Sequence, residues 1–262
     1  MTEAWAGRGG DAAWLMGPAN YLARTMETRW AVDPVMLTCF VPQAITVDPA
    51  VLSRLDFILL THRHRDHMDP ELWSALAGSA IRWIVPGDML VPVCEAGVPQ
   101  ERITPAEAGV PLDLQGMRIT PFAGLHWEYA HGWQRGSPRA GIDATGYFVE
   151  WDGHSLLFPG DTRTYDPAAL PVFSGVQTLV AHVWLGRKAA GNPRPPLLAD
   201  FCGFVAALKP CCNVWLTHLW NVVRKPYDYW DERHARLIRD GLHDLLPGVT
   251  VAAPEFWRGM DL

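Results

Sequence analysis

The stretch Thr61-His62-Arg63-His64-Arg65-Asp66-His67-Met68-Asp69 concentrates histidine and carboxylate side chains in one short segment. Imidazole is the commonest side chain that binds transition metals, and carboxylate oxygens often complete such sites. His62 and His64 are two positions apart and can face one ion, while Asp66 and His67 can face a second. A solvated polar turn is the alternative, but the chain has only 10 histidines in 262 residues, so this clustering is improbable by chance. The stretch predicts a metal-binding loop.

Regular elements are expected on both sides of this loop. Leu55–Leu60 is a short apolar run, which is typical of a buried strand. Asp69-Pro70-Glu71 combines an N-cap residue, a proline at the first helical position and an acid in the first turn, which predicts the start of a helix. The histidines are therefore expected at the carboxyl end of a strand, between two rigid elements, as a pre-organised site requires.

The strand, the H-x-H-x-D-H loop and the helix together resemble the signature of the metallo-β-lactamase superfamily. The resemblance implies an α/β (α+β) fold, the four-layer αβ/βα sandwich of that family. Four further family motifs match this chain in order, from about Ala13 to Met260: Asp33 after Trp30–Val32, His126 after Ile119–Gly124, Asp161 after Leu156–Gly160, and His218 after Val214–Thr217.

The resemblance also implies a ligand set for two divalent metal ions, with zinc expected first and manganese or iron as alternatives. The first ion would be held by His62, His64 and His126, the second by Asp66, His67 and His218, with Asp161 bridging. Asp33 is expected to accept a hydrogen bond from the metal loop, as carboxylates behind ligating imidazoles do.

This ligand set implies a dinuclear metal-dependent hydrolase, in which a metal-bridging hydroxide attacks a phosphodiester or a lactone or other ester. Asp66 is expected to take part in catalysis besides binding metal. A di-iron or mono-iron oxygenase on the same fold and a non-catalytic binding protein are the alternatives. Within the superfamily, His126-Trp127 and Gly160-Asp161-Thr162 look most like the branch of L-ascorbate-6-phosphate lactonases and N-acylphosphatidylethanolamine phospholipase D. The region Gly191–Ala199 lacks the histidine that this branch often has there.

His182 is the notable residue outside the ligand set. It follows the apolar run Thr178–Ala181, and strand ends on this side of the sheet are expected to converge on the metals. It could protonate a leaving group or bind an oxyanion, and a structural role is equally compatible with its position. His131 competes with His126 as the third ligand of the first ion, and His126 is preferred because it lies nearer its strand.

Two stretches, Trp127–Asp143 and Gly186–Pro196, show no regular pattern and are expected to shape the substrate pocket. Their basic residues could bind a phosphate or carboxylate, which predicts a small anionic substrate. The candidates for substrate binding are His131 and Arg187 from these stretches, and Arg163, which directly follows Gly160-Asp161-Thr162 near the expected metals.

Composition agrees with one compact enzyme. The chain has 49% hydrophobic residues and a net charge of −6, which argues against a nucleic-acid partner. It shows no apolar run long enough to span a membrane and no signal-peptide pattern, and its five cysteines form no C-x-x-C pair, so structural or buried thiols in the cytoplasm are expected. An oligomer is compatible with these features. Residues 1–12 are expected to be a flexible start, and residues 13–262 a single metallo-β-lactamase domain.

Local patterns predict the remaining elements. Short strands are expected at 13–16, 21–24, 30–32, 81–85, 117–121, 178–181 and 249–253, and a hairpin at 146–158 around Asp152-Gly153. Helices are expected at 197–208 and 229–246, where apolar residues recur on one face.

Overall fold

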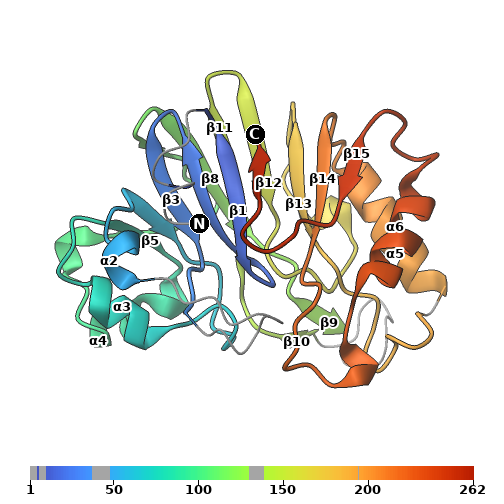
Figure 1. The fold of residues 1–262 in the computed structure, drawn as a ribbon, viewed down its shortest axis with the longest axis horizontal. Coiled ribbons are helices and arrows are strands. Elements are labelled where there is room, and N and C mark those ends of the chain that lie inside the picture. The colour runs from blue at the N-terminus through green and yellow to red at the C-terminus, as the bar shows by residue number, and fades with distance from the viewer. Residues whose placement is uncertain (1–4, 6–9, 37–47, 130–138, 194) are drawn as a thin grey trace. The chain divides into compact units, whose positions relative to one another are not determined.

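The computed structural model describes residues 5, 10–36, 48–129, 139–193 and 195–262. The chain divides into two compact units, and each contains a seven-stranded sheet (Figure 1). Unit 1 comprises Met1–Glu107, Asn221–Val223 and Pro254–Leu262, and unit 2 comprises Ala108–Trp220 and Arg224–Ala253. The predicted mixed α/β fold is confirmed, with one large sheet in each unit.

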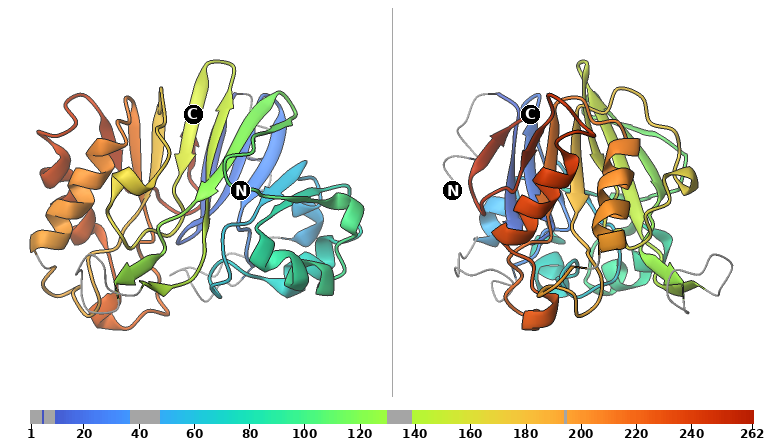
Figure 2. Two further views of the ribbon diagram at one scale, coloured as in Figure 1. Left: turned by 180° about the vertical axis from the view of Figure 1, so that it is seen from behind. Right: turned by 90° about the vertical axis from the view of Figure 1, so that its right-hand side faces the viewer.

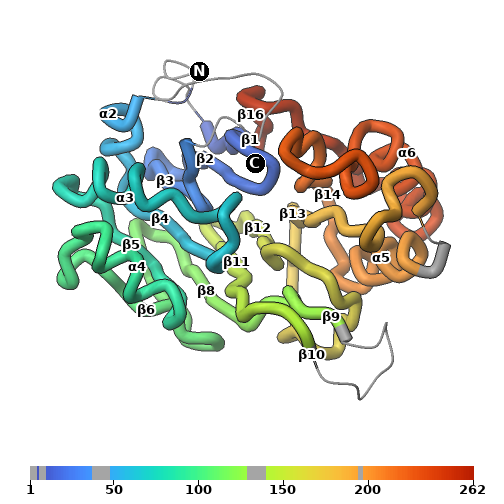
Figure 3. Tube along the Cα trace, turned by 90° about the horizontal axis from the view of Figure 1, so that it is seen from below, coloured from blue at the N-terminus to red at the C-terminus, as the bar shows by residue number. Residues whose placement is uncertain are grey.

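The sheet of unit 1 has the strand order β16-β1-β2-β3-β4-β5-β6. Its strands are β1 (Ala12–Gly17), β2 (Asn20–Thr25), β3 (Thr28–Val32), β4 (Phe57–Leu59), β5 (Arg82–Val85), β6 (Ile103–Pro105) and β16 (Gly259–Asp261). The pairs from β16 to β3 are antiparallel, and those from β3 to β6 are parallel. Figure 3 shows α2 (Pro49–Leu52), α3 (Pro70–Leu76) and α4 (Leu90–Glu95) beside strands β3 to β5.

The parallel pairing of β3 with β4 decides where the metal loop lies in unit 1. Because parallel strands end at the same edge of a sheet, Asp33 after β3 lies beside the segment that follows β4. The backbone N–H of Asp33 donates to the carbonyl of Leu59 at 2.9 Å. Helix α3 begins as predicted, since the side chain of Asp69 accepts a hydrogen bond from the backbone N–H of Leu72 at 3.0 Å.

The sheet of unit 2 has the strand order β15-β14-β13-β12-β11-β8-β7. Its strands are β7 (Leu112–Leu114), β8 (Met117–Ala123), β11 (Thr145–Trp151), β12 (His154–Phe158), β13 (Thr178–His182), β14 (Asn213–Thr217) and β15 (Thr250–Ala252). The predicted hairpin joins β11 and β12, with Asp152 at φ 38° and Gly153 at φ 78°. Two residues at positive φ are the mark of a tight type I′ turn, for which Asp-Gly is a preferred pair.

Two helices cover a face of this second sheet (Figure 2). The helices are α5 (Pro195–Ala207) and α6 (Glu232–Leu242). The apolar strand residues share one core with Phe201 and Val205 of α5, with Leu208 directly after it, and with Ile238 and Leu242 of α6. Helix α6 is shorter than the predicted 229–246. It begins only after Asp231, whose side chain accepts from the backbone N–H of Arg233 at 3.0 Å.

The stretch Trp127–Asp143 was expected to be irregular, and this is wrong at its ends. Strands β9 (Trp127–Tyr129) and β10 (Arg139–Gly141) pair with each other in an antiparallel two-stranded sheet. Each strand has only three residues, so the alternation of polar and apolar side chains is too short to predict the pairing from the sequence. His131 and residues 130–138 around it lie outside the described residues, as do Arg194 and most of the predicted flexible start.

The expectation of structural or buried thiols is right for one of the described cysteines and wrong for the others. Cys202 is buried in α5, whereas Cys94, Cys211 and Cys212 are exposed. Cys39 lies outside the described residues. Among the helices that the structure describes, none is long and apolar enough to cross a membrane.

Candidate functional site

The metal loop of unit 1 brings its imidazoles together directly after β4. Nε2 of His62 lies 3.2 Å from Nδ1 of His64, and the ring centroids of His62 and His67 are 4.0 Å apart. His62 and His67 are buried, while His64 and Asp66 are half-buried. A hydrogen bond from the backbone N–H of His67 to the carbonyl of His64, 2.9 Å long, closes the turn between them. The loop therefore presents nitrogen and oxygen donors from neighbouring positions.

Asp33 accepts hydrogen bonds from this loop. Its carboxylate accepts the backbone N–H of Thr61 at 2.7 Å, the hydroxyl of Thr61, and Nδ1–H of His67 at 2.7 Å. A proton on Nδ1 leaves the lone pair of His67 on Nε2, the other ring nitrogen. Burial raises the pKa of Asp33, although the hydrogen bonds with His67 and Thr61 oppose that effect. Asp33 also lies in the left-handed region at φ 44°, an uncommon conformation for a residue other than glycine.

Asn20 is a site residue that the sequence reasoning missed. Its side-chain amide is fully buried and donates to the carbonyl of Asp33 at 2.8 Å and to the carbonyl of Asp66 at 2.9 Å. It thus joins two segments that carry the predicted site residues. Its position after the Gly17-Pro18 turn was the only local signal, and nothing in that turn indicates a partner 46 positions away.

The predicted site residues of unit 2 also meet at strand ends. Asp161 lies after β12 and His218 after β14, and Nε2 of His218 is 3.5 Å from Oδ2 of Asp161. Nε2 of His126, which follows β8, lies 3.9 Å from the same oxygen. All three side chains are buried. His218 has φ 64°, and such backbone strain is concentrated at functional sites because the surrounding structure must maintain it.

His182 belongs to the same cluster. It ends β13, whose register pairs it with Thr217 of β14, so its ring stands against that of His218 with centroids 4.1 Å apart. Its Nδ1 lies 3.1 Å from the backbone N of Thr162, which donates to it, and 3.3 Å from the carbonyl of Thr162. Its Nε2 is 3.4 Å from Oδ1 of Asp161. Burial, only partly opposed by Asp161, lowers the pKa of His182 well below its ordinary value.

The donors in each unit fit a metal ion. One donor atom each from Asp161, His182 and His218 lies within 4.8 Å of the others. In unit 1, ring nitrogens of His62 and His64 lie 3.2 Å apart. The Nε2 atom of His182 is buried and makes no hydrogen bond with the residues that the structure describes. Neutral imidazole nitrogens and carboxylate oxygens form the donor set that zinc, manganese and iron accept.

Two of the predicted substrate-binding residues are described by the structure, and both contact the carboxylate of one glutamate. Arg163 lies 3.6 Å and Arg187 3.2 Å from the carboxylate of Glu128 in β9. Sequence spacing gives no hint of Glu128, which is 59 positions from Arg187.

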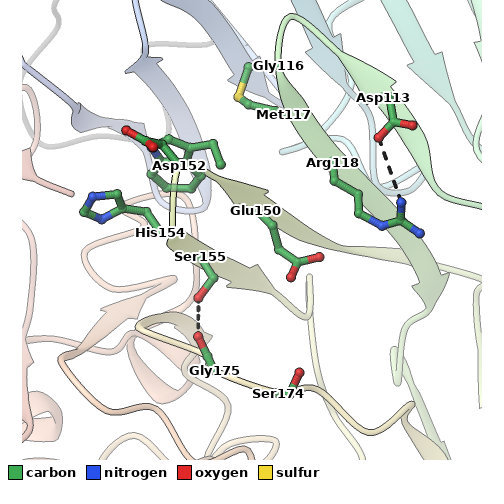
Figure 4. Close-up of a pocket in the computed structure, with 12 residues that line it drawn as sticks. Asp113, Gly116, Met117, Arg118, Glu150, Asp152, His154, Ser155, Ser174 and Gly175 are labelled. Atoms are coloured by element: carbon green, nitrogen blue, oxygen red, sulfur yellow. Dashed lines mark hydrogen bonds and ion pairs between the residues drawn. The ribbon is translucent and has the colours of Figure 1, made fainter.

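Unit 2 also has a pocket that lies away from its predicted metal donors. It is lined by residues such as Asp113, Arg118 and Glu150 and by the turn before His154 (Figure 4). His154 begins β12, whereas Asp161 follows the other end of that strand. The pocket therefore lies at the strand end remote from the predicted donors of this unit.

Comparison with known families decides the chain's classification. Residues 28–194 match the β-lactamase superfamily domain, which is more than half of the chain. The chain belongs to the β-lactamase superfamily. None of the curated proteins matches it.

Several solved structures are similar in fold over nearly the whole chain. Igni18, a metallo hydrolase from Ignicoccus hospitalis, is 17% identical with a TM-score of 0.65, covering 96% of this chain and 99% of that one. CmlA, a diiron β-hydroxylase from Streptomyces venezuelae, is 20% identical with a TM-score of 0.65, covering 97% of this chain and 55% of that one. Zn²⁺-bound PqqB from Methylobacterium extorquens is 14% identical with a TM-score of 0.55, covering 93% and 87%. At these identities the similarity concerns the fold.

Proposed function

We propose that this member of the β-lactamase superfamily is a dinuclear metal-dependent hydrolase of phosphodiesters or of lactones and other esters. One observation carries the proposal: in each unit, buried imidazoles and carboxylates gather where parallel strands end. Imidazole nitrogens and carboxylate oxygens are the donor types that transition-metal sites in proteins use. A cluster of histidine and aspartate donors is thus explained more simply by metal binding than by core packing.

The proposed ligands are the histidines and aspartates of the motifs. His62, His64 and His126 would hold one ion, Asp66, His67 and His218 the other, and Asp161 would be shared. Such ions, when bound, lower the pKa of a coordinated water and polarise the bond under attack. Zinc is the first candidate because the set is rich in imidazole, and manganese and iron also accept it.

Other side chains would orient these ligands and the substrate. Asp33 keeps the proton of His67 on Nδ1, so Nε2 stays available as a ligand. Asp66 is proposed to accept a proton from water besides binding metal. His182, with Nε2 at 3.4 Å from Asp161, is proposed to keep that carboxylate in place or to donate a hydrogen bond to a substrate oxygen.

Substrate class and branch are part of the proposal. Arg163 and Arg187 beside Glu128 favour a small anionic substrate. The segments around His126-Trp127 and Gly160-Asp161-Thr162 favour the branch of ascorbate-6-phosphate lactonases and N-acylphosphatidylethanolamine phospholipase D.

Metal content and ligand variants test the proposal together. Elemental mass spectrometry of the untagged protein should find about two zinc or manganese ions per chain. The variants His64→Ala and Asp161→Ala should lose metal and lower the turnover of a chromogenic phosphodiester or lactone by more than about 100-fold. Circular dichroism should show that both variants keep the fold.

His154→Ala is the matched control, because His154 is an exposed histidine at the far end of β12 from Asp161. It should keep the metal content and turnover of the parent protein. Iron in place of zinc would favour the oxygenase alternative. Absence of metal after reconstitution, or unchanged turnover in both ligand variants, would refute the hydrolase.

A further inference from the structure

Three arginines gather around one buried tryptophan in unit 2. The guanidinium carbons of Arg163, Arg187 and Arg224 lie 4.8, 5.8 and 6.0 Å from the centroid of the Trp184 ring. Trp184 is only 4% exposed. Guanidinium groups stack favourably on indole faces, which partly offsets their mutual repulsion. We call Glu128, Arg163, Trp184, Arg187 and Arg224 the Trp184 cluster.

Two arginines of the cluster contact one carboxylate. Arg187 approaches Glu128 in a two-pronged arrangement, with Nε at 3.2 Å from Oε2 and Nη2 at 3.3 Å from Oε1. Arg163 reaches the same carboxylate at 3.6 Å. An oxyanion bound beside these guanidinium groups would gain charge-assisted hydrogen bonds.

Surrounding contacts make the cluster rigid. The hydroxyl of Tyr165 donates to the carbonyl of Trp184, and the indole of Trp184 meets the fully buried ring of Trp230 edge to face at 6.4 Å between centroids. The backbone N–H of Arg163 donates to the carbonyl of Leu125 at 2.9 Å. A platform fixed by packing and backbone hydrogen bonds needs little rearrangement to bind a ligand, which favours affinity.

The cluster also adjoins the donors of unit 2. Nη2 of Arg224 lies 3.0 Å from Nε2 of His218 and is placed to donate a hydrogen bond to it. Arg163 follows Asp161 by two positions, and the residue to which its backbone N–H donates, Leu125, immediately precedes His126. An anion bound by these arginines would therefore lie beside the predicted reaction centre.

We infer that the Trp184 cluster binds an oxyanion group, a phosphate or a carboxylate, that the substrate carries apart from the bond that is cleaved. The inference deepens the proposed function and rests on it. Guanidinium groups suit this task because their planar array of donors matches the oxygens of carboxylate and phosphate. Arg163 and Arg224, both half-buried, would supply the inner contacts, and the more exposed Arg187 an outer one.

Anion binding to the metal-containing protein tests this inference. Inorganic phosphate and acetate serve as probes in isothermal titration calorimetry, one for each kind of oxyanion. Arg163→Ala and Arg224→Ala should each weaken binding of the preferred probe by about 10-fold or more, because each removes a charge-assisted hydrogen bond. Arg163→Lys, which keeps the charge and loses the planar fork, should weaken it less.

Arg118→Ala is the matched control. Arg118 is a 55% exposed arginine of the same unit whose partner, Asp113, lies 4.0 Å away, so its removal changes net charge equally at a remote place. The affinity of this variant for the probes should stay within about twofold of the affinity of the parent protein, as expected for a screened surface charge. Absence of binding of both probes to the parent protein would overturn the inference. Equal weakening by Arg118→Ala would do the same, since binding would then reflect net charge alone.

Metal content separates this inference from the proposed function. If Arg163→Ala and Arg224→Ala retain their metal and also bind phosphate as the parent protein does, phosphate binds to the ions, and the Trp184 cluster is refuted while the hydrolase stands. If His64→Ala loses its metal but still binds a probe, and adding Arg163→Ala to that variant abolishes this binding, the Trp184 cluster binds anions independently of the metal centre.

Discussion

Replacing Asp33 by asparagine changes one oxygen of a buried side chain and spares the backbone. Asp33 is inaccessible to solvent, and its carboxylate accepts three hydrogen bonds, two from Thr61 and one from His67. Asparagine tolerates the left-handed conformation that this position requires, with φ 44°, at least as well as aspartate does. The variant therefore tests the hydrogen bonds with little added strain.

The expected cost follows from counting donors. One oxygen of Asp33 accepts the backbone N–H of Thr61, and the other accepts the Thr61 hydroxyl and Nδ1–H of His67. Asparagine keeps a single oxygen, so at least one buried donor then faces an amide NH₂. An unsatisfied buried donor costs about 1–3 kcal/mol, and the remaining bonds weaken once the acceptor is neutral. Since the variant also avoids burying a charge, we expect a loss of about 3 kcal/mol in the free energy of unfolding.

Denaturant unfolding of the chelator-treated protein, followed by tryptophan fluorescence, measures this loss. Asp56→Asn is the control, because Asp56 is exposed and its carboxylate accepts one hydrogen bond, from the backbone N–H of Arg29 at 2.8 Å. It should cost less than about 1 kcal/mol. Asp33→Asn should also weaken metal affinity by about 10- to 100-fold, since His67 loses the acceptor that fixes its Nδ1 proton. An unfolding free energy within about 1 kcal/mol of the parent protein would refute the reasoning.

Two further predictions concern unit 2. Asp231→Ala removes the N-cap of α6 and should cost about 1 kcal/mol at pH 7. Burial acts to raise the pKa of Asp231, but its contacts with His234 and Arg233 hold it below its ordinary value, so the cap stabilises the fold above pH 3.8. The difference in unfolding free energy from the parent should shrink as pH falls below that value; a constant difference would contradict the role of the charge. Burial raises the pKa of Cys202 to about 11, so mass spectrometry at pH 8 should find Cys202 alkylated far more slowly than the exposed Cys94, and similar rates would disprove its burial.

The elements that carry the candidate site were predictable because their signals are local. The apolar run before Thr61 and the Asp69-Pro70 cap placed the metal loop between β4 and α3. The Asp152-Gly153 pair likewise predicted the hairpin of β11 and β12, since a tight turn depends on the conformation of its own two residues. The family followed from motif order, which is also a property of the linear chain. The single-domain boundary at residue 13 stays a prediction.

Boundaries were predicted less well where a polar contact competes with periodicity. The apolar spacing continues from Tyr229 to Leu246, but the helix begins after the Asp231 cap and ends at Leu242. Strands β9 and β10 were missed altogether, because three-residue strands carry almost no periodic signal and are held by each other.

The partners of the site residues depend on packing between distant segments. Nothing near Asn20 indicates that it donates to the carbonyls of Asp33 and Asp66, and nothing near Trp184 indicates that Arg163 and Arg224 stack on it. Asn20 meets Asp33 because β2 begins where its antiparallel neighbour β3 ends. The arginines meet Trp184 because parallel strands bring their carboxyl ends to one edge of a sheet. The sequence by itself determines side-chain type and local spacing, and these decide which residues can bind metal. Which side chains lie against them is set by strand order and register, which depend on burying the whole core at once.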